Sequence, residues 1–534
     1  MIVSPAVTSV GAWIELDALR WPLTAAYLGL LALIGVYGLH RYWLVYLFNR
    51  HRRRIHRPAQ RYRALPRVTV QLPMFNEGAV AERVIDAACQ LDYPRDRLQV
   101  QVLDDSTDES AAIAERRAAY WAQRGVDVQY LHRTDRTGYK AGALQDALAQ
   151  ASGELIAIFD ADFVPPPRFL RRVVHYFTDP AVGMVQTRWA HLNRDDSWLT
   201  RGQAIFLDGH FVVEHTARQR SGAWMNFNGT AGVWRREAIE SAGGWQHDTL
   251  TEDVDLSYRA QMVGWKFLFL PRLTCPAELP PEINGFKSQQ HRWTKGSIQT
   301  AMKLLPTVLR SDAPWRVKIE AVFHLTSPLV YLYITLLALL FYPAIFVNLG
   351  AVERGTSIGL TLGLVFFALG TISAAVFYLT SQRAQHRSGW KTLLQVPLLM
   401  SIGIGIALNN ALACLEALCG HQSPFVRTPK YNRQRNGTGR QRDKSRRFVA
   451  DFRLPPSPFR LPSTCLELAM GLYMLECIRL ALTVRSTVVS VPFLALFAAG
   501  YLYVGGTSLW AHAQGQLAAR RPAVVSEPSP PGGA

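Results

Sequence analysis

Residues 154–162 read ELIAIFDAD, an apolar run that ends in two aspartates. The run at 154–159 predicts a buried β-strand, and the three prolines at 165–167 prevent its extension. Asp160 and Asp162 then lie just beyond the carboxyl end of that strand. Paired carboxylates suit a hard divalent cation, which bridges readily to phosphate oxygens. A solvated turn, where aspartate is common, is the alternative for the isolated pattern.

The same alternation of strand and helix extends towards the N-terminus. Strands are predicted at 67–73, 98–103 and 127–131, and helices at 78–91, 109–123 and 141–151. This alternation is typical of an α/β fold with a parallel sheet covered by helices on both faces. Ligands bind outside the carboxyl ends of the strands in such sheets. The expected site is therefore formed by three loops that follow strands: Phe75-Asn76-Glu77, Asp104-Asp105 and Asp160-Ala161-Asp162.

The regions on either side of this α/β segment are strongly apolar. Apolar residues make up 49% of the 534 residues, and five runs are long enough to span a bilayer: 23–48, 321–349, 357–380, 465–484 and 488–511. The first run lacks the basic leader of a cleavable signal peptide, so we expect an anchor. The formal net charge is +18, with basic residues clustered beside the apolar runs. This placement favours an anionic membrane surface and predicts no nucleic-acid partner.

The distribution of Lys and Arg predicts the membrane topology. The basic cluster at 50–54 places the domain that follows it in the cytoplasm. The stretch 392–419 is apolar enough to span, but a span there would export the many basic residues at 427–447. We therefore expect 392–419 to be an interfacial or re-entrant element, broken near 403–405 and 409–410. Six spans with an exported basic loop are the alternative.

Five short motifs occur in a fixed order along the chain: DDSTD at 104–108, DAD at 160–162, TED at 251–253, QQHRW at 289–293 and FVRTPK at 425–430. Over residues 67–450 this pattern resembles the signature of processive family 2 glycosyltransferases of the cellulose synthase superfamily. The last motif resembles their gating loop. The compact catalytic segment resembles the cellulose-synthase-like branch, which includes mannan and glucan synthases. The resemblance implies an α/β GT-A domain beside an α-helical transmembrane bundle.

The resemblance implies that one group of residues binds a nucleotide-sugar donor. Phe75 and Glu77 match the loop that holds the nucleobase, although phenylalanine replaces the family's tyrosine and lacks its hydroxyl. Asp104 and Asp105 match the aspartate motif at the base and ribose, and which of them makes the contact stays open. Lys140 matches the lysine near the diphosphate, where a cation offsets charge on the leaving group.

The same resemblance implies the catalytic and metal-binding residues. Asp160 and Asp162 match the metal ligands, with Mg²⁺ or Mn²⁺ as the cofactor. Asp253 matches the general base that deprotonates the acceptor hydroxyl as it attacks the anomeric carbon. The alternative for residues 251–253 is a helix N-cap with acidic first-turn residues, which is compatible with the catalytic role.

The acceptor-binding residues implied by the resemblance lie in two segments, and they are Asn228, Gly229, Gln289, Arg292 and Trp293. The indole of Trp293 offers a flat apolar face to a sugar ring. As an isolated pattern, residues 285–305 predict an amphipathic helix at the membrane surface. In the segment that resembles the gating loop, Thr428 and Lys430 are expected to approach the diphosphate.

The predicted function is inverting, processive synthesis of a β-linked glucan or mannan/glucomannan from UDP-glucose or GDP-mannose. The growing polysaccharide is the acceptor and would leave through a channel in the same protein. A non-processive transferase that adds one sugar to a lipid is one alternative, and a membrane scaffold or transporter with a degenerate catalytic domain is another. The predicted location is a bacterial inner (plasma) membrane, in contact with lipid, and accessory export subunits are left open.

The predicted domains follow these features along the chain. They are an N-terminal transmembrane anchor (1–54), a cytoplasmic GT-A domain (55–284), amphipathic interfacial helices (285–315), a transmembrane hairpin with an interfacial element (316–420), a cytoplasmic gating loop (421–450), a C-terminal transmembrane hairpin (451–512) and a disordered tail (513–534).

Overall fold

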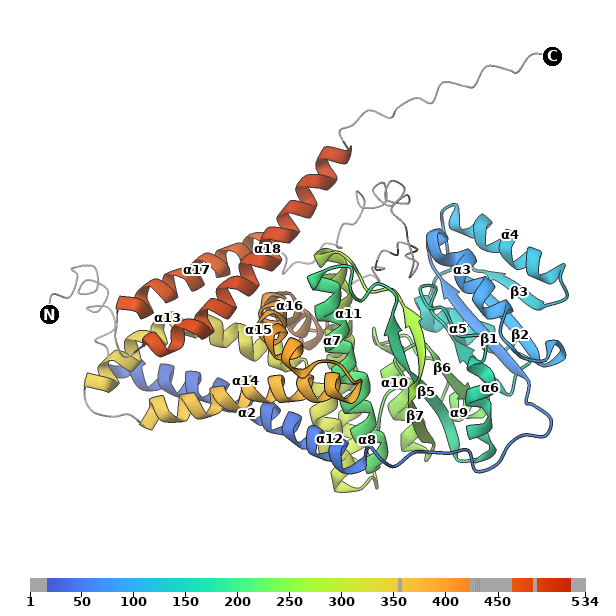
Figure 1. Cartoon of the computed structure of the whole chain (residues 1–534), viewed down its shortest axis with the longest axis horizontal. Coiled ribbons are helices and arrows are strands. Elements are labelled where there is room, and N and C mark those ends of the chain that lie inside the picture. Colours follow the sequence, from blue (N-terminus) through green and yellow to red (C-terminus); the bar gives the residue numbers. More distant parts are fainter. Residues whose placement is uncertain are drawn as a thin grey trace, which may run out of the picture.

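The computed structural model describes residues 17–353, 358–422, 428, 430, 432, 463–483 and 487–519. Figure 1 shows an α/β domain at one end of the molecule and long helices at the other, with helix α11 (Ile283–Arg310) between them. Helix α2 (Asp17–His51) leads from the long helices into the α/β domain, and α11 leads back. A site between the two regions can therefore draw residues from both.

The α/β domain is built on a seven-stranded sheet in the order β3-β2-β1-β4-β6-β5-β7. Its first four strands in sequence are parallel neighbours, as the alternating pattern predicts. The strands are β1 (Val68–Met74), β2 (Leu98–Asp104), β3 (Asp127–His132), β4 (Leu155–Ile158), β5 (Val182–His191), β6 (Gly232–Arg235) and β7 (Lys266–Ala277).

The other half of the sheet differs from the predicted parallel arrangement. Strand β6 runs antiparallel to both β4 and β5, with Ile158 opposite Gly232. Because β6 follows the segment 228–230, its reversed direction brings that segment to the carboxyl end of β4. There the backbone N–H of Asp160 donates a hydrogen bond to the Thr230 hydroxyl at 2.9 Å. The sheet is therefore mixed, and the reversed strand places residues 228–230 beside the two aspartates.

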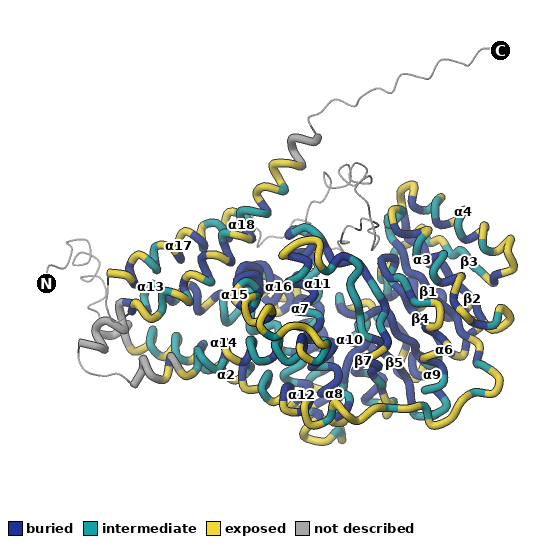
Figure 2. The backbone as a smooth tube through the Cα atoms, viewed as in Figure 1, coloured by how far each residue is buried: buried dark blue, intermediate teal, exposed yellow. Residues whose placement is uncertain are grey.

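Strand β4 is buried on both faces. Leu155 and Ala157 belong to one apolar core, whereas Ile156 and Ile158 belong to the other. Successive side chains of a strand point to opposite faces, so a continuous apolar run is what a strand covered on both sides requires. Figure 2 shows the central strands buried and the outer helices partly exposed. The end of β4, where Asp160 follows, is thus held by packing on two sides.

The helices of the α/β domain connect and cover these strands. The predictions at 78–91, 109–123 and 141–151 correspond to α3, α4 and α5. The helices are α3 (Gly78–Cys89), α4 (Ser110–Ala122), α5 (Tyr139–Leu148), α6 (Phe169–Val173), α7 (Trp198–Asp208), α8 (Thr216–Ser221), α9 (Arg236–Ser241) and α10 (Glu252–Met262). Two 3₁₀ turns, η1 (Arg95–Arg97) and η2 (Val174–Thr178), and one π-helical turn, η3 (Gly209–His215), complete this part.

The second region is formed by α2 and further helices, of which α13 and α14 pack directly against α2 (Figure 1). The further helices are α12 (Trp315–Thr326), α13 (Leu329–Glu353), α14 (Ile358–Ala384), α15 (Gly389–Gly405), α16 (Ala407–Leu418), α17 (Ser463–Thr483) and α18 (Val491–Ala519), with a 3₁₀ turn η5 (Val488–Ser490) before the last.

Three helical segments of the described chain are long and apolar enough to cross a membrane: Trp21–His51, Val365–Ala384 and Val488–Gln514. Two bent pairs raise the number to as many as five if each pair is one span. One pair is α12 with α13, bent by 55°, and the other is α15 with α16, bent by 41°. These helices fit a membrane protein.

The predictions for this region match these helices only in part. Helix α17 covers the predicted span 465–484 but is not among the segments above, and it carries Glu467, Glu476 and Arg479. The bend between α15 and α16 falls at Ile406, next to the predicted break at 403–405. At the C-terminus, α18 continues to Ala519, past the predicted start of the tail at 513. The remainder of that predicted tail lies outside the described residues.

Candidate active site

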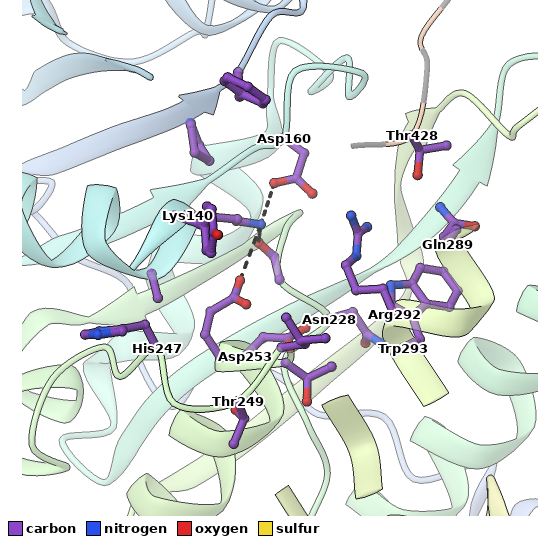
Figure 3. A pocket seen from close by; sticks show the side chains of 18 of the residues that line it. Lys140, Asp160, Asn228, His247, Thr249, Asp253, Gln289, Arg292, Trp293 and Thr428 are labelled. Atoms are coloured by element: carbon purple, nitrogen blue, oxygen red, sulfur yellow. Dashed lines mark hydrogen bonds and ion pairs between the residues drawn. The ribbon is translucent and has the colours of Figure 1, made fainter. Parts of the chain in front are cut away.

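A cavity of about 1110 Å³ lies where the carboxyl ends of β1, β2 and β4 face helix α11. Figure 3 shows Lys140 and Asp160 on one side of it and Arg292 and Trp293 on the other. All predicted site residues except Asp104 line this cavity, and they are Phe75, Glu77, Asp105, Lys140, Asp160, Asp162, Asn228, Gly229, Asp253, Gln289, Arg292, Trp293, Thr428 and Lys430. Segments that are distant in the sequence thus meet in one space.

The structure distinguishes the two neighbouring aspartates of the first motif. Asp104 is fully buried, accepts hydrogen bonds from the Ser106 backbone N–H at 2.9 Å and the Tyr130 hydroxyl at 2.7 Å, and does not line the cavity. Asp105 does line it, and accepts two hydrogen bonds from the guanidinium of Arg133 at 2.8 and 2.7 Å. The geometry therefore favours Asp105 for the nucleoside contact and gives Asp104 a role in holding the loop.

Each aspartate of the DAD motif is paired with a lysine. The Lys140 ammonium lies 2.6 Å from Asp160 and also donates to the Gly229 carbonyl at 2.9 Å. The Lys430 ammonium lies 2.8 Å from Asp162. Burial acts against the charged form of both lysines, but the neighbouring carboxylates outweigh it and raise the pKa of each. Both amines therefore stay cationic beside the carboxylates at neutral pH.

Two carboxylates facing one cavity form a donor set that fits a hard divalent cation. Within the described residues no group of three or more His, Cys, Asp or Glu side chains could hold a metal ion. A cation held by Asp160 and Asp162 would therefore need further ligands other than His, Cys, Asp or Glu side chains of the described residues. Diphosphate and water supply such ligands, which is the usual situation of Mg²⁺ at phosphate sites.

Asp253 lies in the first turn of α10, at the boundary between the two sides of the cavity. Its carboxylate accepts a hydrogen bond from the Val254 backbone N–H at 2.9 Å. Burial and the neighbouring Glu252 raise the pKa of Asp253 to about 7, although Lys140 opposes the shift. A carboxylate with that pKa is poised to accept a proton near neutral pH.

The expected cap of this helix is only partly present. Helix α10 begins directly after Thr251, but the Thr251 side chain makes no capping hydrogen bond. Its hydroxyl instead lies 3.1 Å from the hydroxyl of Thr300 on α11. A Cβ added to Gly296 of α11 would lie 2.5 Å from the Thr251 methyl group, so only glycine allows this approach. Helix α11 thus positions the start of α10, which carries Asp253.

Gly229 brings the predicted acceptor segment against Asp253. Its φ of +76° is in the left-handed region that favours glycine. A Cβ here would lie 3.2 Å from a carboxylate oxygen of Asp253 and 3.3 Å from the Lys140 ammonium. A side chain at this position would therefore intrude between the Asp253 carboxylate and the Lys140 ammonium.

The comparisons with known proteins agree with this geometry. Residues 66–296 match the family model described as glycosyltransferase like family 2. This segment is a family 2 glycosyltransferase domain. Its mixed sheet is of the GT-A type.

The domain has close relatives among plant enzymes. The chain is 45% identical over 251 residues to glucomannan 4-β-mannosyltransferase 2 of Arabidopsis thaliana, covering 46% of this chain and 47% of that protein. It is 42% identical over 268 residues to glucomannan 4-β-mannosyltransferase 1 of Oryza sativa subsp. japonica, covering 49% and 51%. The chain thus spans about half the length of the known relatives it matches.

A solved structure resembles a larger part of the chain. It is the mannosyltransferase of Pyrobaculum calidifontis in complex with GDP-Man and Mn²⁺, with a TM-score of 0.50 and 26% sequence identity. The match covers 67% of this chain and 99% of that one.

Sequence reasoning missed three residues of the glycosyltransferase site. The Arg136 guanidinium lies 3.4 Å from the ring centre of Phe75, and Arg133 binds Asp105. Both arginines follow β3, so the rule that ligands bind at strand ends could have found them. Trp189 lies 6.4 Å from Trp293 between ring centres, and no local signal marks it. Its position depends on the packing of β5 against α11.

A second cavity of about 510 Å³ continues from the glycosyltransferase site into the long helices. Trp189, Asn228, Asp253, Gln289 and Trp293 line both cavities. The second is lined further by side chains of α2, α13, α14, α15 and α18. The two cavities therefore adjoin at a wall that contains Asp253.

The predicted gating-loop residues are placed only in part. Thr428 and Lys430 line the first cavity, and the buried Thr428 hydroxyl has no partner among the described residues. Asn432 accepts a hydrogen bond from Arg83 at 3.1 Å. The predicted loop positions 425–427 and 429 lie outside the described residues.

Proposed function

We propose that this chain is an inverting mannosyltransferase that extends a β-linked mannan or glucomannan from GDP-mannose. The observation that carries the proposal is the shared cavity, in which Asp253 lies between the lysine-paired aspartates and the Trp293 side. The plant relatives are glucomannan 4-β-mannosyltransferases and the archaeal structure is a mannosyltransferase, which supports mannose over glucose as the donated sugar. UDP-glucose is the other donor that the sequence predicts.

The reaction is a single displacement. Asp253 takes the proton of the acceptor hydroxyl as that oxygen forms a bond to the anomeric carbon. The bond from the anomeric carbon to the diphosphate breaks, and GDP leaves with the electron pair. Displacement at one carbon inverts its configuration, so an α-linked donor gives a β-linked product. The 2.9 Å hydrogen bond to Val254 orients the Asp253 carboxylate for this step.

The donor side of the site stabilises the departing diphosphate. Lys140 is held between Asp160 and the Gly229 carbonyl, so its charge is already oriented before the reaction. Asp160 and Asp162 would hold Mg²⁺ or Mn²⁺, which when bound supplies positive charge to the phosphate oxygens. Thr428 and Lys430 are proposed to close on the diphosphate and release it after transfer.

The acceptor side supports repeated addition. Trp293 and Trp189 offer aromatic faces to a sugar, and the second cavity begins where they lie. Because sugar hydroxyls cannot cross hydrocarbon without partners, a growing chain needs a path through the protein. We therefore propose that the second cavity is the start of the exit path and that the product is a polymer.

The same proposal places the glycosyltransferase domain in the cytoplasm, because the basic residues that flank the apolar helices stay on that side. The relatives named above come from plants, so they give no support to the predicted bacterial inner membrane.

The test uses the full chain purified in detergent, with Mn²⁺ and either GDP-mannose or UDP-glucose. We expect GDP release from GDP-mannose and a β-linked product many residues long. A single mannose on a lipid would identify the non-processive alternative. Release of nucleotide only from UDP-glucose, with a glucan as product, would contradict the choice of donor.

A further inference from the structure

The helix that runs from α7 through η3 to α8 contains one π-helical turn, and this turn faces the acceptor segment. In η3 the backbone bonds run from residue i to i+5, so residues five apart come to lie on one face. His210 and His215 are five apart, and their ring centres are 4.4 Å from each other. In an α-helix of 3.6 residues per turn they would point in different directions.

Both histidines bind the side chain of Asn228. The Asn228 carbonyl oxygen lies 2.6 Å from Nε2 of His215, and its amide nitrogen lies 2.9 Å from Nε2 of His210. On the far side, Nδ1 of His210 lies 2.9 Å from a carboxylate oxygen of Glu214. The side chain of Asn228 is therefore held at both ends by one helical turn.

The chemistry of the partners fixes which atoms carry protons. The Glu214 carboxylate accepts only, so Nδ1 of His210 donates to it and Nε2 of His210 is left to accept from the Asn228 amide. Asn228 then presents its carbonyl oxygen to His215, whose Nε2–H donates. Burial lowers the pKa of His215 well below its ordinary value, which keeps the ring neutral and suited to this role.

The chain of partners continues to the membrane part. Arg218 lies 3.2 Å from Glu214 and 2.8 Å from Glu320 of α12, and Glu320 lies 2.9 Å from His40 of α2. Arg218 is almost fully buried, and Glu320 is also buried. Glu214 is therefore held in place by an ion pair that is itself anchored on two long helices.

One N–H of the Asn228 amide is used by His210, and the other has no hydrogen-bond partner among the described residues. Asn228 lines both cavities, whereas His210 and Glu214 line only the second. The remaining amide N–H of Asn228 is thus placed to donate a hydrogen bond to a ligand oxygen in either of the two cavities. A hydroxyl of the sugar acceptor is a neutral acceptor group that suits it.

We propose that His210 and His215 are positioning residues that orient the Asn228 amide, so that its remaining N–H binds a hydroxyl of the acceptor sugar beside Asp253. This inference rests on the proposed function. It adds a role to the π-helical turn, whose residues would bind the acceptor only through Asn228.

The test compares variants of the full chain in detergent, with GDP-mannose as donor and β-1,4-mannohexaose as the acceptor probe. His210→Phe keeps a ring but removes the acceptor nitrogen, and we expect the KM for mannohexaose to rise about tenfold. The KM for GDP-mannose and its hydrolysis without acceptor should not change. His210→Gln, whose side-chain oxygen can accept the same hydrogen bond, should restore the KM to within about threefold.

A double-variant comparison separates positioning from general loosening of the structure. If His210 acts through Asn228, then His210→Phe should add nothing to Asn228→Ala, because the group it orients is already absent. His175→Phe is the matched control, since the His175 ring accepts a hydrogen bond from the Tyr62 backbone N–H at 3.2 Å and lines neither cavity. Should His210→Phe not fold, His215→Phe removes the other hydrogen bond and carries the same expectation.

Three results distinguish the two proposals. Transfer by the wild-type protein with an unchanged KM in His210→Phe would overturn the positioning role alone. Fully additive losses in the double variant would do the same. Failure of the wild-type protein to transfer mannose to the probe, with normal transfer from another donor, would count against the proposed function instead.

Discussion

The two sides of the cavity differ in charge. On the donor side Asp105, Asp160 and Asp162 each pair with a cationic side chain at 2.6–2.8 Å. On the acceptor side lie amides and an indole, with Arg292 as the one predicted cation. Asp253 stands between them, with a pKa raised to about 7. In the proposed reaction, charge is therefore concentrated where the diphosphate would depart, whereas neutral hydrogen bonds and stacking would bind a sugar that must later move on.

The largest expected effect comes from removing charge on the donor side. Asp162→Ala should lower transfer by about 10³-fold or more, because it removes one of two protein ligands for the cation. Chelation of divalent ions should have the same effect and be reversed by added Mn²⁺. The measurement is GDP release under saturating donor, with thermal unfolding as the check on folding.

Asp127→Ala is the matched control for that variant, since Asp127 begins β3 and lies far from the cavity, paired loosely with Arg67 at 3.6 Å. It should transfer normally. Full turnover of the wild-type protein in excess chelator would show that transfer does not need a divalent ion.

The next effect tests the residue at the boundary. Asp253→Asn keeps the shape of the side chain but removes its basicity, so transfer should fall by at least about 10²-fold while GDP-mannose still binds. Donor affinity by calorimetry and the single-turnover rate separate the two. Normal turnover would show that the base lies elsewhere, and Glu252 would be the next residue to replace.

A smaller effect is expected on the acceptor side. Trp293→Ala removes a stacking face, so product length should shorten and elongation slow by about tenfold, while donor hydrolysis is retained. Trp198→Ala, at the exposed start of α7, is the control. Equal losses of elongation and hydrolysis would show that Trp293 supports the whole site and not the acceptor alone.

The smallest effect concerns the part of the donor side that is proposed to bind the nucleobase. Arg136→Ala removes the cation 3.4 Å above Phe75 and should raise the KM for GDP-mannose by about fivefold, with kcat little changed. Arg124→Ala removes a similar stack, 3.5 Å above Tyr120 on the outer surface, and should have no effect. An unchanged donor KM in Arg136→Ala would mean that the stack is only structural.

The donor side could be predicted because its residues follow strands. The run at 154–159 alternates between two cores, and β4 was found there as Leu155–Ile158, with Asp160 two residues beyond its end. Strand ends in parallel sheets meet at one edge, so local patterns sufficed. The roles of the acceptor residues came from the resemblance, because nothing local indicates that α11 lies against the carboxyl edge of the sheet.

Other features depend on packing between distant segments. The reversal of β6 follows from its pairing with β4, and no pattern in a four-residue strand gives its direction. The sequence around the π-helical turn at Gly209–His215 is that of an ordinary helix, so it does not indicate the turn. The choice between Asp104 and Asp105 depends on Tyr130 and Arg133, which lie on or after the neighbouring strand.

The pH dependence of single-turnover transfer tests the central claim, that Asp253 is the base between the two sides. A base must be deprotonated to act, so the rate should be constant above the pKa of about 7 and fall about tenfold per unit below it. The residual rate of Asp253→Asn should lack this step. A wild-type rate that stays level from pH 5.5 to pH 8.5, with donor bound throughout, would contradict the claim.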